Sequence, residues 1–232
     1  MALASLSEDL DCAALRAELS PFGACIGTRR IRVGDEAAFA DTQSASLARR
    51  RASGAARIVA RRLLEELGFA SASTLARSPT GAPQWPAGVV GSLAHDETFA
   101  AAVAARRGAI AGLGVDVEPA EPLPEDVVDL VLTSGEMRET AGDGLARRLI
   151  FCAKEAVYKA IHPLDGTSLD YHDIRVSLPK GIAILADGRR LRLLRLAGDR
   201  LIAVALFPVL ALATAHCNGR HEAGNRGRYA EA

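Results

Sequence analysis

The chain has 232 residues, of which 49% are hydrophobic and 24% are charged. This is the composition of an ordinary globular protein with enough apolar surface for one large domain or two small lobes. A folded chain is therefore expected, not a disordered one. Lysine plus arginine and aspartate plus glutamate both number 28. The net charge therefore gives no reason to expect a nucleic acid or an anionic membrane as partner, and any basic site has to be local.

The cysteines and the apolar runs indicate where in the cell the protein is expected. Four cysteines are scattered, with no Cys-x-x-Cys pair and no histidine at zinc-ligand spacing: Cys12, Cys25, Cys152 and Cys217. Neither a disulfide framework nor a structural zinc is predicted, and a reducing, cytoplasmic location is expected. Acids at positions 8, 9 and 11 interrupt any signal-peptide core. The apolar run 201–215 contains Pro208 and is shorter than the roughly 20 residues of a membrane span, so no span is expected.

The first half of the chain predicts a basic helix and a small sheet. Residues 46–67 combine an apolar stripe with a strongly basic opposite face, and Gly68 is a stop signal. Residues 89–95 predict a short strand that runs into a loop. The Ala-rich residues 98–106 fit a helix or a strand, because a short apolar run does not separate the two. Residues 108–114 predict a turn followed by a strand.

The second half predicts two helices and then a sheet. A helix begins after Pro124 with acids in its first turn, and residues 133–136 interrupt it. Residues 145–161 predict a long helix closed by Pro163. Alternating segments bounded by Gly and Asp turns then predict an antiparallel sheet at 174–178, 181–185, 190–196 and 201–207. The last residues, 216–232, are expected to be a polar, mobile tail.

Two short segments place four charged side chains where they can meet. Asp116 and Glu118 are two apart in an apolar run, so on a strand both carboxylates point the same way. Glu155 and Lys159 are four apart on the long helix and share one face. Together with His95, this cluster suits a metal-held polyphosphate.

Each of these features also has a plainer explanation. An Asp-x-Glu pair is commonly a pair of solvated strand residues, and Glu155 with Lys159 can be a surface ion pair. His95 can be a loop histidine that satisfies local hydrogen bonds. The arginines of residues 49–62 can be a solvated helix face. The metal interpretation of the acid pair also requires that a phosphate substrate binds, because Mg²⁺ takes few carboxylates and shares phosphate oxygens.

Three motifs in a fixed order resemble one family, the 4′-phosphopantetheinyl transferases, and in particular the bacterial group that includes the enterobactin synthase component. Residues 85–95 are similar to its Trp-Pro-x-Gly-x-x-Gly-Ser-x-x-His segment. Residues 114–118, Gly-Val-Asp-Val-Glu, are similar to its Gly-Ile-Asp-Ile-Glu. Residues 153–159, Ala-Lys-Glu-Ala-Val-Tyr-Lys, are similar to its Ala-Lys-Glu-Ser-x-Tyr-Lys. The resemblance covers residues 49–207, including residues 163–176.

The resemblance implies a catalytic cluster. Asp116, Glu118 and Glu155 would hold Mg²⁺, or Mn²⁺ in its place, on the pyrophosphate of coenzyme A. His95 and Lys159 would neutralise phosphate oxygens as charge builds on the leaving group. Glu155, directly or through a metal-bound water, would accept the proton of a carrier-protein serine.

Further coenzyme A contacts are implied by the same resemblance. They are Arg57 at the 3′-phosphate, helped by Arg49 and Arg77, with Leu169 and Tyr158 lining the channel. Ala94 stands where the family usually has Ser or Thr, which leaves only a backbone N–H for the phosphate, and Ala52 stands where an acid is frequent. Neither change removes a metal ligand, so activity is expected to survive. Glu136 matches a less regular acid of the family, and its role stays open.

The expected fold is α+β, with two similar lobes related by a pseudo-twofold, each a helix packed on an antiparallel sheet. The lobes are predicted at residues 1–112 and 113–215, with coenzyme A in the cleft between them and residues 216–232 as the tail. The implied reaction transfers 4′-phosphopantetheine from coenzyme A to a serine of an apo acyl or peptidyl carrier protein and releases adenosine 3′,5′-bisphosphate. The carrier could belong to siderophore, polyketide or fatty-acid synthesis.

Two other classes of function remain as alternatives. The first is a non-catalytic module that binds a carrier protein or coenzyme A and descends from such an enzyme. The second is a nucleic-acid binder that uses the arginines of residues 49–62, which the low aromatic content of 4% disfavours. A monomer without nucleic-acid or membrane partners is the expectation.

Overall fold

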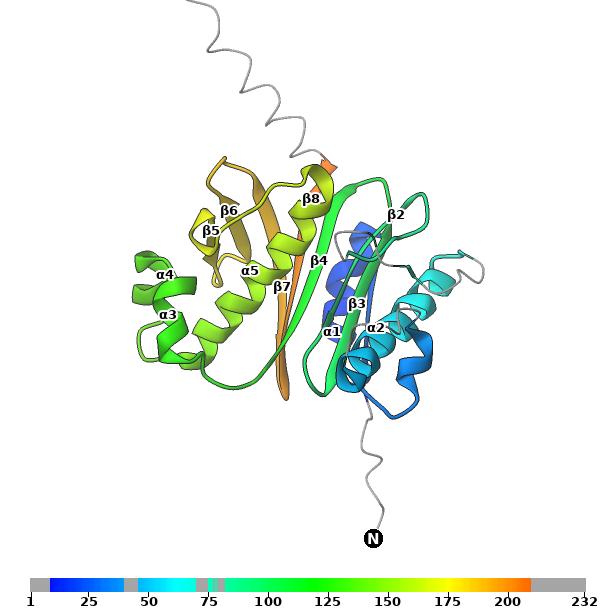
Figure 1. Ribbon diagram of the computed structural model, residues 1–232. Helices are drawn as coiled ribbons and strands as arrows, with labels where there is room; N and C mark the ends of the chain where they lie inside the picture. The colour runs from blue at the N-terminus through cyan, green and yellow to red at the C-terminus, as the bar shows by residue number, and fades with distance from the viewer. Residues whose placement is uncertain (1–8, 40–45, 70–74, 77, 79–81, 210–232) are drawn as a thin grey trace, which may run out of the picture.

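The computed structural model describes residues 9–39, 46–69, 75–76, 78 and 82–209. Figure 1 shows two sheets with helices packed against them. All strand pairs are antiparallel, in a three-stranded sheet of order β1-β3-β2 and a five-stranded sheet of order β4-β8-β7-β6-β5. The predicted α+β class is confirmed. The predicted tail at 216–232, as well as Arg77 and Cys217, lies outside the described residues.

The first elements along the chain build the small sheet and its helices. They are α1 (Ala13–Leu19), η1 (Ser20–Phe22), β1 (Ala24–Arg30), η2 (Asp35–Ala38), α2 (Leu47–Glu66), β2 (Val89–His95) and β3 (Phe99–Arg106). The helix predicted at residues 46–67 is confirmed as α2, and the Ser46 side chain caps it by accepting a hydrogen bond from the Arg49 N–H. The ambiguous run 98–106 is strand β3.

The remaining elements build the large sheet and its helices. They are β4 (Ile110–Pro119), α3 (Glu125–Val131), α4 (Ser134–Glu139), α5 (Gly144–Asp165), η3 (Tyr171–Asp173), β5 (Ile174–Ser177), β6 (Ile182–Leu185), β7 (Arg190–Ala197) and β8 (Arg200–Pro208). The predicted antiparallel sheet is confirmed. The division expected at residue 112 falls inside β4, which pairs with β8.

The two sheets share a core and are each covered by a helix on the other side (Figure 1). On β3, Val103 belongs to the core between the sheets, while its neighbour Ala104 belongs to the core under α2. On β8, Val204 faces the shared core and Ala205 faces α5. Because successive side chains of a strand alternate between faces, strands covered on both sides become continuous apolar runs. This explains why the sequence of β3 shows no strand period.

The interruption predicted at residues 133–136 is confirmed, because α3 ends at Val131 and α4 begins at Ser134. The new helix is capped, since the Thr133 hydroxyl accepts from the Glu136 N–H and the Glu136 carboxylate accepts from the Thr133 N–H. Two features differ from the sequence expectation. Pro163 does not close α5, which continues to Asp165 and ends at Gly166 with φ 71°. A proline in the last turn removes only one backbone hydrogen bond. The sequence analysis also missed α1 and β1.

No helix in the described ranges is long and apolar enough to cross a membrane.

Candidate functional site

Two glycines of β4 bring α5 into direct backbone contact with that strand. A Cβ built on Gly114 would lie 1.9 Å from the Ala156 carbonyl oxygen, and one on Gly112 would lie 2.3 Å from the Ala160 carbonyl oxygen. Only glycine allows this approach. The close packing places the helix residues of the third motif directly over the strand residues of the second.

Asp116 and Lys159 meet at this contact. The Lys159 Nζ donates to Asp116 Oδ1 at 2.6 Å, and the Asp116 side chain is 8% exposed. Burial raises the pKa of Asp116, opposed by Lys159 and reinforced by the charge of Glu155. Burial by itself lowers the pKa of Lys159, but the carboxylates of Asp116 and Glu155 outweigh it and raise that pKa. The lysine therefore carries its positive charge beside these acids.

Glu118 is tied to the start of α5. The Arg148 Nη1 donates to Glu118 Oε2 at 3.0 Å, and the same guanidinium donates to the carbonyls of Glu121 and Pro122. Burial, followed by the negative charge of Asp116, raises the pKa of Glu118 to about 7, although Arg148 opposes the shift. The carboxylates of Asp116 and Glu118, on one face of β4, thus repel each other where the protein partly shields them from water.

Glu155 faces the same cluster from α5. Its charge contributes to the raised pKa values of Asp116 and Lys159, which puts it near both groups. The Tyr171 hydroxyl donates to Glu155 Oε1 at 2.7 Å. The charges of Asp116, Glu118, Glu155 and Lys159 therefore act on one another between β4 and α5, and Asp116 and Lys159 are in direct contact.

His95 approaches from the small sheet, at the end of β2. Its side chain is exposed to solvent, but the surrounding protein desolvates it enough to lower its pKa, and the charges of Lys159 and Arg49 add to that effect. Arg49 is exposed in the first turn of α2. His95 thus lies within electrostatic range of both Lys159 and Arg49.

Two other residues predicted to contact coenzyme A, Arg57 and Ala94, have buried side chains. Arg57 is 8% exposed, and its guanidinium donates to the carbonyls of Leu75 and Ser53 and stacks over the Phe39 ring. The Ala94 methyl is buried in the core between the sheets, so only the backbone of that residue could face a ligand.

Tyr158 lines two cavities, of about 320 Å³ and 410 Å³. Ser92, Lys159 and His162 line the first, and Glu155, Leu169 and Tyr171 line the second. Trp85 also lines the first cavity, and its indole packs against Gly91, where a Cβ would clash at 2.6 Å. The acid cluster therefore has space beside it for an elongated ligand.

The acids fit a divalent cation in their chemistry. Within the described ranges, no three His, Cys, Asp or Glu side chains are grouped as a ready metal site, and Lys159 occupies Asp116 Oδ1. In that same part of the chain, however, the buried Asp116 Oδ2 has no hydrogen-bond partner. An unsatisfied buried carboxylate oxygen, with two further acids whose charges act on it, is a donor set suited to a hard cation.

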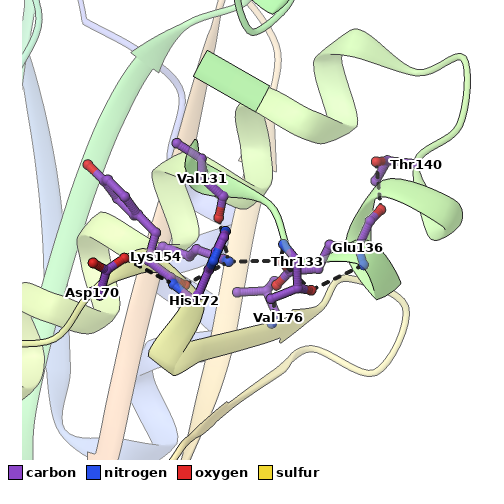
Figure 2. Close-up of polar contacts among 9 residues, drawn as sticks. Val131, Thr133, Glu136, Thr140, Lys154, Asp170, His172 and Val176 are labelled. Atoms are coloured by element: carbon purple, nitrogen blue, oxygen red, sulfur yellow. Dashed lines mark hydrogen bonds and ion pairs between the residues drawn. The ribbon is translucent and has the colours of Figure 1, made fainter. Parts of the chain in front are cut away.

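Sequence reasoning missed a buried ion pair next to this cluster. Lys154 Nζ donates to Glu136 Oε2 at 2.8 Å, and the two side chains are 0% and 3% exposed (Figure 2). Two signals were available in the sequence. Lys154 falls on the same helix face as Ile150 and Val157, and Thr133-x-x-Glu136 is a capping-box pattern.

Comparison with known proteins agrees with the motifs. Residues 35–105 match the 4′-phosphopantetheinyl transferase N-terminal domain, and residues 112–205 match the 4′-phosphopantetheinyl transferase superfamily. The chain belongs to the 4′-phosphopantetheinyl transferase superfamily.

Three relatives illustrate the similarity. The chain is 40% identical over 128 residues to 4′-phosphopantetheinyl transferase Svp of Streptomyces mobaraensis. The aligned residues make up 53% of this chain and 52% of Svp. It is 38% identical over 122 residues to PptT of Mycobacterium tuberculosis, covering 51% of this chain and 53% of PptT. Enterobactin synthase component D of Escherichia coli K12 is 32% identical over 143 residues, or 59% of this chain and 66% of that protein. The chain spans about half the length of Svp and PptT.

Proposed function

We propose that this protein transfers 4′-phosphopantetheine from coenzyme A to a serine hydroxyl of an apo acyl or peptidyl carrier protein. Adenosine 3′,5′-bisphosphate is the second product. The observation that carries the proposal is the convergence of Asp116, Glu118, Glu155 and Lys159 around a buried carboxylate oxygen without a partner. Membership of the superfamily and the names of the relatives support the same activity.

The transfer needs one proton acceptor and groups that stabilise a phosphate leaving group. In our assignment the serine oxygen forms a bond to the phosphorus that carries pantetheine, and the bond from that phosphorus to the bridging oxygen breaks. Glu155 accepts the serine proton. Lys159 stabilises the charge that builds on the leaving phosphate, and His95 donates a hydrogen bond to it.

Asp116, Glu118 and Glu155 are the residues proposed to hold Mg²⁺, or Mn²⁺ in its place. When bound, the ion supplies positive charge against the pyrophosphate oxygens. The carboxylates would then repel one another less, and this repulsion adds to burial in raising the pKa values of Asp116 and Glu118. Lys159 would be released from Asp116 to face the phosphate.

The two cavities support a placement for coenzyme A. We assign the pantetheine arm to the cavity lined by Glu155, Tyr158 and Leu169. The 3′-phosphate is assigned to Arg57 of α2, helped by Arg49 in the first turn of that helix and by Arg77. The Ala94 backbone N–H is the corresponding group for a phosphate at the end of β2. We also propose two lobes divided near residue 112.

Other properties follow as proposals from the sequence. A cytoplasmic location fits the free thiols of Cys12, Cys25 and Cys152 in the described part of the chain. We also propose that the protein is a monomer. Siderophore, polyketide and fatty-acid carriers, including those of an enterobactin-type synthase, are the candidate acceptors.

The experiment is incubation of the full chain with an apo carrier protein, coenzyme A and Mg²⁺, followed by mass spectrometry of the intact carrier. The expected result is a gain of one phosphopantetheine group, which disappears when the carrier serine is replaced by alanine. Asp116→Ala is the matched inactive variant. Binding of coenzyme A without any modification of several carriers would instead identify a non-catalytic binding module and overturn the proposal.

A further inference from the structure

Tyr171 contacts two consecutive residues of α5 in different ways. Its hydroxyl donates to Glu155 Oε1 at 2.7 Å, and its backbone carbonyl accepts from Lys154 Nζ at 2.9 Å. Its ring packs on Phe151, with 5.8 Å between the ring centres. One residue of η3 is therefore fixed to α5 by its backbone, its ring and its hydroxyl.

Lys154 uses its whole ammonium group to hold this arrangement. It donates to Glu136 Oε2 and to the Val131 carbonyl, both at 2.8 Å, as well as to Tyr171 (Figure 2). An ammonium has three N–H donors, and all three are satisfied. The side chain is completely buried, so these contacts have no competition from solvent.

Glu136 holds the other end of the same segment. Its Oε1 accepts from the Val176 N–H at 2.7 Å, and its Oε2 accepts from the Thr133 N–H and hydroxyl. The ion pair therefore fixes the segment 171–176 at both ends, through Tyr171 and through Val176.

A buried ion pair is a poor device for stability alone. Apolar side chains of similar size usually stabilise a core as well, because they avoid the desolvation cost of two charges. What the pair supplies is a fixed orientation, since all three Lys154 N–H groups and both Glu136 carboxylate oxygens have partners. The pair thereby holds Tyr171 in place, and the Tyr171 hydroxyl in turn holds the Glu155 carboxylate.

We propose that Tyr171 is a positioning residue for Glu155, and that the buried Glu136–Lys154 pair fixes Tyr171 for this role. With Oε1 held by the hydroxyl, Oε2 of Glu155 is presented to the reacting serine in one orientation. A free glutamate side chain would instead sample several rotamers. The inference rests on the proposed function, in which Glu155 is the proton acceptor.

The test uses Tyr171→Phe, which keeps the ring on Phe151 and removes only the hydroxyl. We expect kcat for carrier modification to fall about tenfold, because a hydrogen bond to a charged group is lost, with KM for coenzyme A nearly unchanged. Thr140→Val is the matched control. It removes a buried hydroxyl that donates to the Glu136 carbonyl and has no contact with Tyr171 in the described ranges. That variant should lose some stability and keep the parental kcat.

A second measurement reports on Glu155 without catalysis. The side-chain carboxyl ¹³C signal of Glu155, identified through Glu155→Gln, should shift in Tyr171→Phe and stay in place in Thr140→Val. An unchanged signal together with parental kcat would overturn the positioning role. A parent protein that modifies no carrier would overturn the proposed function, and the carboxyl signal would still decide whether Tyr171 orients Glu155.

Discussion

Arg200 of β8 donates to Asp96 in the turn between β2 and β3, with 2.5 Å between Nε and Oδ2, and so joins the large sheet to the small one. The same guanidinium donates to the Thr98 hydroxyl and lies over the Phe99 ring. Asp96 in turn accepts from the Thr98 and Phe99 N–H groups. His95 is the neighbour of this junction, so the link holds the turn that follows the proposed phosphate contact.

We expect Arg200→Gln to lower the free energy of unfolding by about 2 kcal/mol, because a charge-assisted contact to a nearly buried carboxylate is lost. Arg189→Gln is the control, since its partners Asp165 and Asp187 are about half exposed, and it should change stability by less than about 1 kcal/mol. Urea titration measures both. Equal effects would show that the Arg200 link is an ordinary surface pair.

Gly114→Ala should be strongly destabilising, by roughly 3 kcal/mol or more, because the added Cβ overlaps the Ala156 carbonyl in the backbone of α5. The displaced helix should also separate Lys159 from Asp116 and lower the transfer rate of the protein that still folds. Gly108→Ala serves as control, since nothing lies within 4 Å of its Cβ. A parental melting temperature for Gly114→Ala would contradict the close contact between β4 and α5.

Glu118 should make the metal-free protein less stable as the pH rises. Its folded pKa of about 7 is above the unfolded value of 4.5, so its proton favours the folded state. This contribution is complete below pH 4.5 and is lost as the pH rises through 7. In chelator, the stability difference between the parent and Glu118→Gln should therefore fall by roughly 3 kcal/mol over that window. Urea titrations at several pH values measure it, and a flat difference would contradict the shift.

Mg²⁺ should bind well only when coenzyme A is present, because the ion keeps several waters and shares phosphate oxygens with few carboxylates. Calorimetric titration of Mg²⁺ with and without coenzyme A measures this. Asp116→Asn, which keeps the side-chain volume and removes the charge, should abolish the coupled binding. Chelation should stop transfer without unfolding the protein. Equal metal affinity in the two titrations would remove the reason for assigning these acids to a phosphate-coupled ion.

Arg57→Met should have two separate effects. Loss of the hydrogen bonds to the Leu75 and Ser53 carbonyls should lower the free energy of unfolding by about 1–3 kcal/mol. If the residue also helps to bind the 3′-phosphate, the KM for coenzyme A should rise about tenfold while the KM for dephospho-coenzyme A stays the same. Equal changes for the two substrates would limit Arg57 to a packing role.

Much of the fold could be predicted because its signals are local. Three signals depend on neighbouring residues alone: the basic face and Gly68 stop signal of α2, the Gly and Asp turns of the large sheet, and the spacing of Asp116 and Glu118 on one strand face. Strand β3 could not be distinguished from a helix in the sequence. Distant segments bury both of its faces, so its residues are apolar throughout and do not alternate between polar and apolar. The break between α3 and α4 was predicted at residues 133–136, but its capping box was not recognised.

The sequence by itself determined the superfamily, the α+β class and the faces on which Asp116, Glu118, Glu155 and Lys159 lie, because motif order and side-chain periodicity are written along the chain. Only the tertiary structure decided that Lys159 pairs with Asp116 and that Arg57 is buried. It also decided that Lys154, within the same motif as Glu155, points into the core toward Glu136. Those partners are 18 or more positions apart in the chain, so packing of α5 on β4 and α4, rather than local pattern, selects them.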